Sequence, residues 1–182
     1  QTPAGRQRLV SPEDTAGARA GASEMAYPLR RRSCHYGGML WVAMAALLLM
    51  APTTAAVDDE EAAARLLSLV NAARAERGLA PVCPDPLLEE AARENTQRMV
   101  RERRLRHSSA ARLRRLGAGG VAENVGFAAD PDTLHRLLLA SRGHRANLLG
   151  PFNRIGIVAT RGRDGLLYAT FVFASGAREG GQ

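Results

Sequence analysis

Two stretches of this 182-residue chain, Ala122-Glu123-Asn124-Val125 and Ser141-Arg142-Gly143-His144-Arg145-Ala146-Asn147-Leu148-Leu149, carry most of its information about fold and site. Together with His107-Ser108 they place two imidazoles and one carboxylate beside turns or helix ends. Such a set is a plausible facial ligand group for a divalent metal such as zinc. Each residue also has a structural interpretation: His107 as a helix C-terminal cap, Glu123 as a loop hydrogen-bonding group, and His144 as a cap of its own helix.

The segments around these stretches have recognisable periods. Asp130-Pro131 is a cap followed by proline and predicts a helix through Leu138 that ends at Gly143, with one or two further helical turns over 144–149. His135 is expected on the surface of that helix. Residues 155–161 and 166–174 alternate in polarity around a turn at 162–165, which predicts a β-hairpin.

The part of the chain before the site is helical by the same criteria. Acidic residues at 58–61 and apolar residues at helical spacing predict a first helix closed by Arg74, Arg77 and Gly78. Asp85-Pro86 predicts a second helix that runs to about Arg103. Residues 121–127 look extended. Helices thus come first and a hairpin last, so we predict an α+β fold in which helices cover a small sheet.

The first 56 residues do not look like part of the folded domain. Residues 1–24 have no apolar period and are interpreted as disordered or as a mis-called gene start. Residues 25–56 combine an arginine triplet, an apolar run and small residues, which is typical of a signal peptide cut after Ala56. A retained membrane anchor is the alternative, although the apolar run is shorter than the roughly 20 residues that a spanning helix needs. We expect a domain over 57–176, a mobile tail over 177–182, and a secreted or periplasmic location.

The chain after Ala56 has 126 residues and a modest net charge of +4, from 19 arginines and 15 acidic residues. This length suffices for one packed core. Cleavage would leave Cys83 as the single cysteine, for which we favour a buried free thiol over an exposed or intermolecular role.

Many of the arginines surround His107 in sequence: Arg98, Arg101, Arg103, Arg104, Arg106, Arg112, Arg114 and Arg115. Their positive field raises the cost of placing a divalent cation nearby, so any metal should bind weakly and with pH sensitivity. The cluster is interpreted as a solvated face or as a surface for anionic groups, such as lipid headgroups or wall polymers. The scarcity of aromatic residues argues against specific nucleic-acid binding.

The order and spacing of several short motifs resemble the CAP superfamily of cysteine-rich secretory, antigen 5 and pathogenesis-related proteins, particularly its bacterial SCP-like branch. The matching residues are Leu69-Val70-Asn71, Arg74, Gly78-Leu79, Leu88, Ala91-Ala92, Met99, His107-Ser108, Gly117, Glu123-Asn124-Val125, Ser141, Gly143 to Leu149 and Ile155-Gly156-Ile157. The resemblance implies a three-layer α-β-α sandwich with a cleft lined by two histidines and two glutamates. The sequence departs from the eukaryotic members in one respect, because the disulfides typical of them are missing here.

Carried over residue by residue, His107 resembles the first histidine of that tetrad, Glu123 the first glutamate and His144 the second histidine. The position of the second glutamate is occupied by Ser141, so the resemblance implies a triad rather than a tetrad. Asn147 stands where many eukaryotic members have glutamine and is expected to line the same cleft.

Two functions are consistent with these residues. The first, which we favour, is an extracytoplasmic binding module whose His/Glu cleft accepts a divalent metal, a lipid, another small apolar ligand or a cell-wall component. The membrane would be contacted through the signal segment. The second is a hydrolase, in which a histidine oriented by Glu123 is the general base or a metal activates water. The chain has neither a Gly-x-Ser-x-Gly nor a His-Glu-x-x-His motif, which weighs against this second function.

Overall fold

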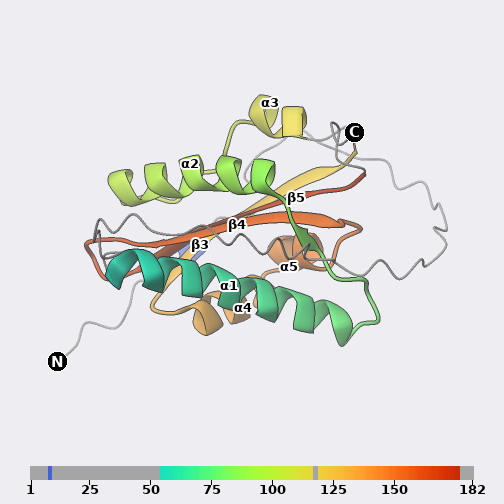
Figure 1. Ribbon diagram of the computed structural model, residues 1–182, viewed down its shortest axis with the longest axis horizontal. Coiled ribbons are helices and arrows are strands. Elements are labelled where there is room, and N and C mark those ends of the chain that lie inside the picture. Colours follow the sequence, from blue (N-terminus) through green and yellow to red (C-terminus); the bar gives the residue numbers. More distant parts are fainter. Residues whose placement is uncertain (1–7, 10–53, 117–118, 177–182) are drawn as a thin grey trace, which may run out of the picture.

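The computed structural model describes residues 8–9, 54–116 and 119–176. Most of the region 1–24, the proposed signal segment up to residue 53 and the tail 177–182 lie outside these residues. In the described part, helices cover both faces of one sheet (Figure 1). The predicted α+β class and the α-β-α sandwich are therefore confirmed.

The sheet is mixed but mainly antiparallel. Its strands, in spatial order, are β1 (Arg8–Leu9), β3 (Val121–Ala128), β5 (Leu167–Ala174), β4 (Arg154–Arg161) and β2 (Cys83–Pro84). Among the described strands, β2 and β4 form the one parallel pair. β4 and β5 are the predicted hairpin, and Gly165 in their turn has a φ of 78°, which glycine adopts without steric cost. Every residue of β5 is buried, so this strand is the centre of the fold.

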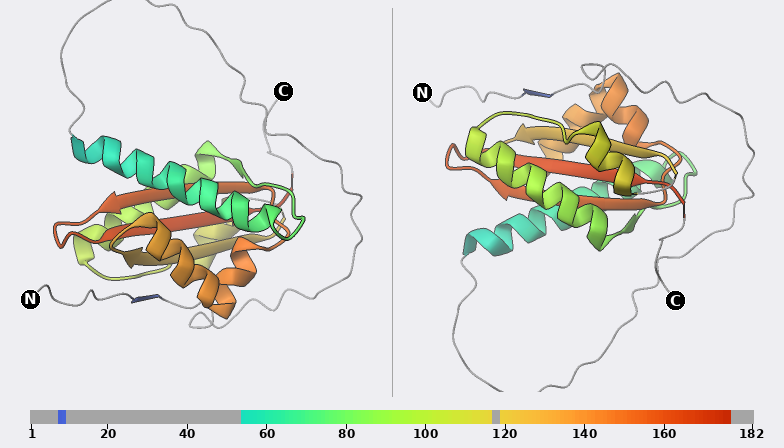
Figure 2. Two further views of the ribbon diagram at one scale, coloured as in Figure 1. Left: turned by 90° about the horizontal axis from the view of Figure 1, so that it is seen from below. Right: turned by 90° about the horizontal axis from the view of Figure 1, so that it is seen from above.

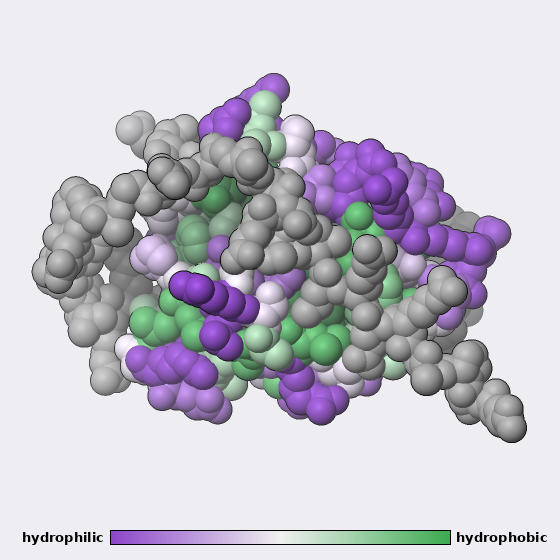
Figure 3. Space-filling model, turned by 180° about the vertical axis from the view of Figure 1, so that it is seen from behind, coloured by the Kyte–Doolittle hydropathy of each residue, from purple (hydrophilic) through white to green (hydrophobic). Residues whose placement is uncertain are grey.

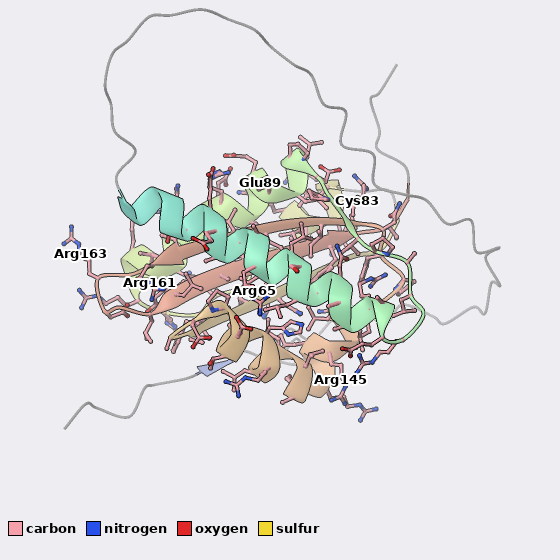
Figure 4. The ribbon with its side chains drawn as sticks, turned by 60° about the horizontal axis from the view of Figure 1, so that its bottom comes forward. Arg65, Cys83, Glu89, Arg145, Arg161 and Arg163 are labelled. Carbon is pink, nitrogen blue, oxygen red and sulfur yellow. The ribbon has the colours of Figure 1, made fainter. Side chains whose placement is uncertain are left out.

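The helices form two layers (Figure 2). α1 (Thr54–Ala75), α4 (Pro131–Ala140) and α5 (Arg142–Leu148) cover one face of the sheet. α2 (Pro86–Glu102), α3 (Ala110–Leu113) and the short 3-10 helix η2 (Arg114–Leu116) lie on the other. On the first face, Arg65 of α1 donates two hydrogen bonds to Asp132 of α4, at 2.7 and 3.1 Å (Figure 4). None of the described helices is long and apolar enough to cross a membrane.

α2 matches its prediction closely. Asp85 caps it by accepting hydrogen bonds from the backbone N–H groups of Leu87 and Leu88, and Arg103 ends it in a left-handed conformation at φ 49°. Its apolar residues Leu88, Ala91, Ala92 and Met99 are buried, and the helix packs against β4 and β5. The contact with β4 requires a glycine, because a Cβ on Gly156 would lie 2.1 Å from the carbonyl carbon of Leu88.

The core has one part on each side of the sheet. Below α1 and α4, the largest cluster of buried residues includes Leu66, Val70, Leu134, Leu138, Phe171 and Phe173. Below α2, a smaller cluster includes Leu88, Ala91, Ala92, Val158 and Val172. Alternate residues of β5 therefore pack against the helices on opposite faces of the sheet, because successive side chains of a strand point to opposite faces.

Two predicted helix boundaries are wrong. α1 begins at Thr54 rather than near Asp58, because the alanines before the acidic residues are themselves strong helix formers. The break between α4 and α5 falls at Ser141, whose backbone is extended (φ −80°, ψ 126°), and Gly143 lies inside α5. The carbonyl of Ser141 accepts the Arg145 N–H, so this residue ends one helix and begins the next.

Two predictions about single residues are also wrong. His135 is buried rather than on the surface, because it lies on the side of α4 that faces α1 and the core. Burial lowers the pKa of its imidazole by desolvation, against the raising effect of Asp132 and Glu76. Cys83 is half-buried rather than buried. It is disulfide-bonded in the full chain, whereas the predicted free thiol refers to the domain cleaved after Ala56, in which Cys83 is the single cysteine.

Candidate functional site

The structure joins His107 and Glu123 in a buried pair. Glu123 lies in β3 and His107 lies in the loop between α2 and α3, and the His107 Nδ1 atom is 2.9 Å from the Glu123 Oε1 atom. The same carboxylate oxygen accepts the backbone N–H of Ser108 at 2.8 Å. Only 2% of the Glu123 side chain and 12% of the His107 side chain are exposed.

α2 positions the loop that carries His107. The side chain of Asn95 donates to the Arg106 carbonyl at 2.9 Å, and the guanidinium of Arg98 donates to the His107 carbonyl at 3.1 Å. Leu105 is buried beside Met99, which anchors the start of the loop. His107 is therefore held by one helix and one strand rather than left as a partly exposed cap.

The hydrogen bonds of the pair determine which of its atoms remain available. An ionised carboxylate can only accept hydrogen bonds. The Nδ1 atom of a neutral His107 must therefore be protonated and donate its hydrogen bond to Glu123 Oε1. The other ring nitrogen, Nε2, then presents a lone pair. Among the described residues, neither His107 Nε2 nor Glu123 Oε2 has a hydrogen-bond partner, and both atoms are buried. The pair thus presents two acceptor atoms that nothing in the described residues satisfies.

Asn124 links the pair to α5 on the opposite face of the sheet. Successive side chains of a strand point to opposite faces, and Asn124 donates to the His144 carbonyl at 3.0 Å. Its own side-chain oxygen accepts from Asn147 at 2.8 Å, and Asn147 also reaches the Glu123 carbonyl at 3.4 Å. His144 is fully buried on α5.

The predicted site residues therefore fall into two groups that share β3. His107 and Glu123 meet on one face, whereas the backbone carbonyl of His144 and the side chain of Asn147 contact Asn124, which points to the other face. Ser141 is half-buried at the α4–α5 junction, and its side chain makes no capping hydrogen bond. Among the residues that the structure describes, no group of three or more histidine, cysteine, aspartate or glutamate side chains could hold a metal ion.

The donor atoms present can be compared with what zinc requires. His107 Nε2 and Glu123 Oε2 are ligand types that zinc accepts, whereas tight zinc sites use three or four protein ligands. The pair therefore fits a weakly held ion with water among its ligands, and it does not fit a closed structural zinc site.

Three contributors to the site were missed by the sequence analysis as site residues. The backbone N–H of Ser108 fixes the Glu123 carboxylate, Arg98 fixes the His107 loop, and Asn124 connects β3 to α5. Asn124 could have been found, because a polar residue next to Glu123 in a buried strand must point to the opposite face and needs a partner there. The other two depend on a loop path that periodicity does not reveal.

The fold and the site define a class of protein: an α-β-α sandwich with a buried histidine–glutamate pair at strand β3. The model of the cysteine-rich secretory protein family, CAP, matches residues 67–173, which is more than half of the chain. The chain belongs to the CAP family, as the resemblance of its motifs predicted, and its domain is of the SCP-like type. No curated protein matches it.

Solved bacterial structures share the fold. An outer surface protein of Borrelia burgdorferi is 17% identical, with a TM-score of 0.58 over 65% of this chain and 95% of that one. An extracellular SCP-domain protein of Bacillus anthracis is 23% identical, with a TM-score of 0.57 over 69% of this chain and 45% of that one. A cysteine-rich secretory protein of Staphylococcus aureus is 24% identical, with a TM-score of 0.54 over 63% and 39%. At these identities the likeness concerns the fold alone, and the chain spans less than half of the last two proteins.

Proposed function

We propose that this chain is an exported CAP-domain binding module whose ligand is bound at the His107–Glu123 pair. The observation that carries the proposal is the pair of adjacent buried acceptors, His107 Nε2 and Glu123 Oε2, that lack partners. A buried polar atom without a hydrogen bond costs about 1–3 kcal/mol, so a ligand that satisfies both atoms recovers a useful part of its binding free energy here.

The chemistry of these two atoms limits the ligand. Two acceptors side by side favour a cation or a group that donates hydrogen bonds, such as the hydroxyl or ammonium of a small molecule, a lipid or a cell-wall component. A divalent ion would be held by His107 and Glu123 and would supply a weak Lewis acid. We assign His144, Asn147 and Ser141 to the surroundings of the site, where Asn147 steadies the backbone of Glu123 through its hydrogen bonds.

Export is part of the proposal. It is supported by the signal-peptide pattern of residues 25–56 and by the family's structural neighbours, two of which are named as outer surface or extracellular proteins. We place the mature domain in the periplasm or outside the cell. Mass spectrometry of the exported protein tests the cleavage site, which we predict after Ala56.

A second function, hydrolysis, is favoured by one feature of the same pair. A histidine whose Nδ1 is bound to a carboxylate and whose Nε2 is available has the arrangement of a general base. Ester and peptide substrates distinguish the two functions. If the wild type turns over one of these substrates and His107→Ala does not, the function is hydrolysis. Binding of a ligand without turnover supports the binding function.

The first experiment is a thermal unfolding series with and without zinc at neutral pH on the wild type, His107→Ala and Glu123→Gln. A ligand at about 100 times its dissociation constant stabilises the fold by roughly 2.7 kcal/mol, which is a readily measured shift. We expect this shift in the wild type and in the control His135→Gln, whose histidine is buried elsewhere. Equal shifts in all four proteins, or none in the wild type, would contradict cation binding at the pair.

A further inference from the structure

A pocket of about 370 Å³ lies next to the His107–Glu123 pair, between α2 and the segment that leads into α3. Its wall includes Arg98 and Arg101 of α2, Arg112 of α3, and Ser108 of the loop. Hydrophilic side chains gather on this part of the surface, around the end of α2, in the view from behind (Figure 3). Neither His107 nor Glu123 lines the pocket, so it is separate from the candidate site.

The pocket carries an excess of positive charge. Its one carboxylate, Glu94, is paired with Arg112 across the pocket wall. The hydrogen bond from Arg112 lowers the pKa of Glu94, so this carboxylate stays ionised and its charge is matched. The charges of Arg98 and Arg101 are left over. Arg101 is exposed and forms no ion pair or hydrogen bond with a described side chain.

The hydrogen-bonding groups of the pocket are unbalanced in the same direction. The side-chain oxygen of Asn95, a potential acceptor in the wall, already receives the Arg98 guanidinium at 2.6 Å. Several donors remain. The Nε–H of Arg98 is buried and has no partner, and the hydroxyl of Ser108 makes no hydrogen bond within the described residues. Gln97 adds a carboxamide oxygen and Glu94 a carboxylate, but the guanidinium groups of Arg98 and Arg101 still give the lining more donors than acceptors.

We propose that this pocket binds the phosphate group of a phosphate ester. Guanidinium groups match phosphate oxygens in charge and in the geometry of their paired N–H donors, and a serine hydroxyl adds a further donor. At about 30 Å³ per water molecule, the pocket has room for roughly a dozen waters, which is more than one phosphate group needs. The remaining space has room for the alcohol part of an ester.

This site goes beyond the ligand proposed for the pair, although the two sites share one loop. Arg98 reaches the carbonyl of His107, and Ser108, whose hydroxyl belongs to the pocket, holds Glu123 through its backbone. The phosphate ester can come from a soluble molecule or from a lipid headgroup. These sources present the same group and are distinguished by the experiment.

The test measures binding in two arms. Calorimetry with glycerol 3-phosphate reports a soluble ester, and co-sedimentation with phosphatidylcholine vesicles, with and without phosphatidylglycerol, reports a lipid headgroup. Binding in either arm supports the proposal and identifies the source. The proposal is overturned if the wild type binds neither glycerol 3-phosphate nor the vesicles.

Three variants separate a shaped pocket from general attraction to a basic protein. Arg101→Gln removes an unpaired pocket charge and should weaken binding about tenfold, and Ser108→Ala should weaken it about threefold without changing any charge. The matched control is Arg136→Gln, which removes an exposed arginine from α4 on the other face of the sheet and should change affinity less than twofold. Equal losses in Arg101→Gln and Arg136→Gln would overturn the proposal. Circular dichroism melts confirm that each variant is folded.

Discussion

Arg74 and the His107–Glu123 pair are both buried polar groups, but they differ in how completely they are satisfied. Arg74 is 3% exposed, and its three guanidinium nitrogens donate to the carbonyls of Ala80, Leu148, Gly150 and Phe152 at 2.9–3.0 Å. The pair leaves Nε2 and Oε2 without partners. The donors of Arg74 are saturated by the fold, whereas these two acceptor atoms have no partner among the described residues.

The position of Arg74 explains its saturation. It stands in the last turn of α1 and connects two segments distant in sequence, the loop after α1 and the α5–β4 connection. Burial lowers its pKa by desolvation, a cost that the surrounding carbonyls offset by accepting its donors.

Arg74→Met should cause the largest loss of stability. The substitution leaves four carbonyl groups without their donor, and we expect a loss of about 4 kcal/mol in the free energy of unfolding, measured with urea. Arg77→Met is the control, because Arg77 is exposed in the next turn and should cost less than about 0.5 kcal/mol. Similar losses in the two variants would show that the carbonyl cluster around Arg74 does not stabilise the fold.

Asp85→Asn should cost about 3 kcal/mol at neutral pH. An asparagine still caps α2, but it leaves the nearly buried guanidinium of Arg154, at 2.9 Å from Asp85, without a negative partner. Desolvation raises the pKa of Asp85, but the hydrogen bonds from Arg154, Leu87 and Leu88 together bring it below its ordinary value of 3.8.

Because its folded-state pKa is lowered, Asp85 contributes stability above pH 3.8 that is lost as the pH falls through the folded-state pKa. Denaturant titrations between pH 5 and pH 2 should therefore show a steeper loss in the wild type than in Asp85→Asn. Parallel pH profiles for the two proteins would rule out this role.

Glu123→Gln should cost no more than about 1 kcal/mol of stability. The amide oxygen of glutamine still accepts from Ser108 and His107, and the lost Oε2 made no hydrogen bond. The same variant should lose the zinc-dependent shift in its thermal melt. A destabilisation as large as that of Arg74→Met would assign the pair to the framework of the fold and not to a ligand.

The smallest effect concerns His135. Burial lowers its pKa below the ordinary 6.5, so the unfolded chain takes up a proton more readily than the folded one. The stability from the neutral ring is complete above pH 6.5 and falls as the pH drops through the folded-state pKa. Melting temperatures measured from pH 8 to pH 5 should decrease in the wild type and remain flatter in His135→Gln, and an unchanged slope in the variant would contradict this assignment.

Much of the fold could be predicted because its signals are local. The cap and proline at Asp85-Pro86 predicted the start of α2 without any tertiary contact. The alternation of polarity on either side of 162–165 predicted the hairpin. The errors lie where long-range packing decides. His135 looked exposed among its polar neighbours, but the packing of α4 under α1 buries it. Arg74 was predicted only as a residue that closes the first helix, and the loops that enclose it could not be placed from sequence periodicity.

The candidate site could be predicted in part. Its residues were identified from their setting and from the family motif, and His107 and Glu123 do meet. Their relation to His144 could not be predicted. Strand alternation predicts that Glu123 and Asn124 point to opposite faces of the sheet, but it does not say that α5 covers the face that Asn124 reaches. Spacing in sequence says nothing about which face of a sheet a later helix will cover.

The central claim is that the His107–Glu123 pair presents a free Nε2 lone pair for a ligand. Long-range ¹H–¹⁵N NMR of the histidine rings tests it directly, with zinc added in steps at neutral pH. We expect a His107 ring that is protonated at Nδ1, with an Nε2 resonance that zinc shifts while the resonances of His135 stay in place. A ring protonated at Nε2, or an Nε2 resonance of His107 unchanged by zinc, would contradict it.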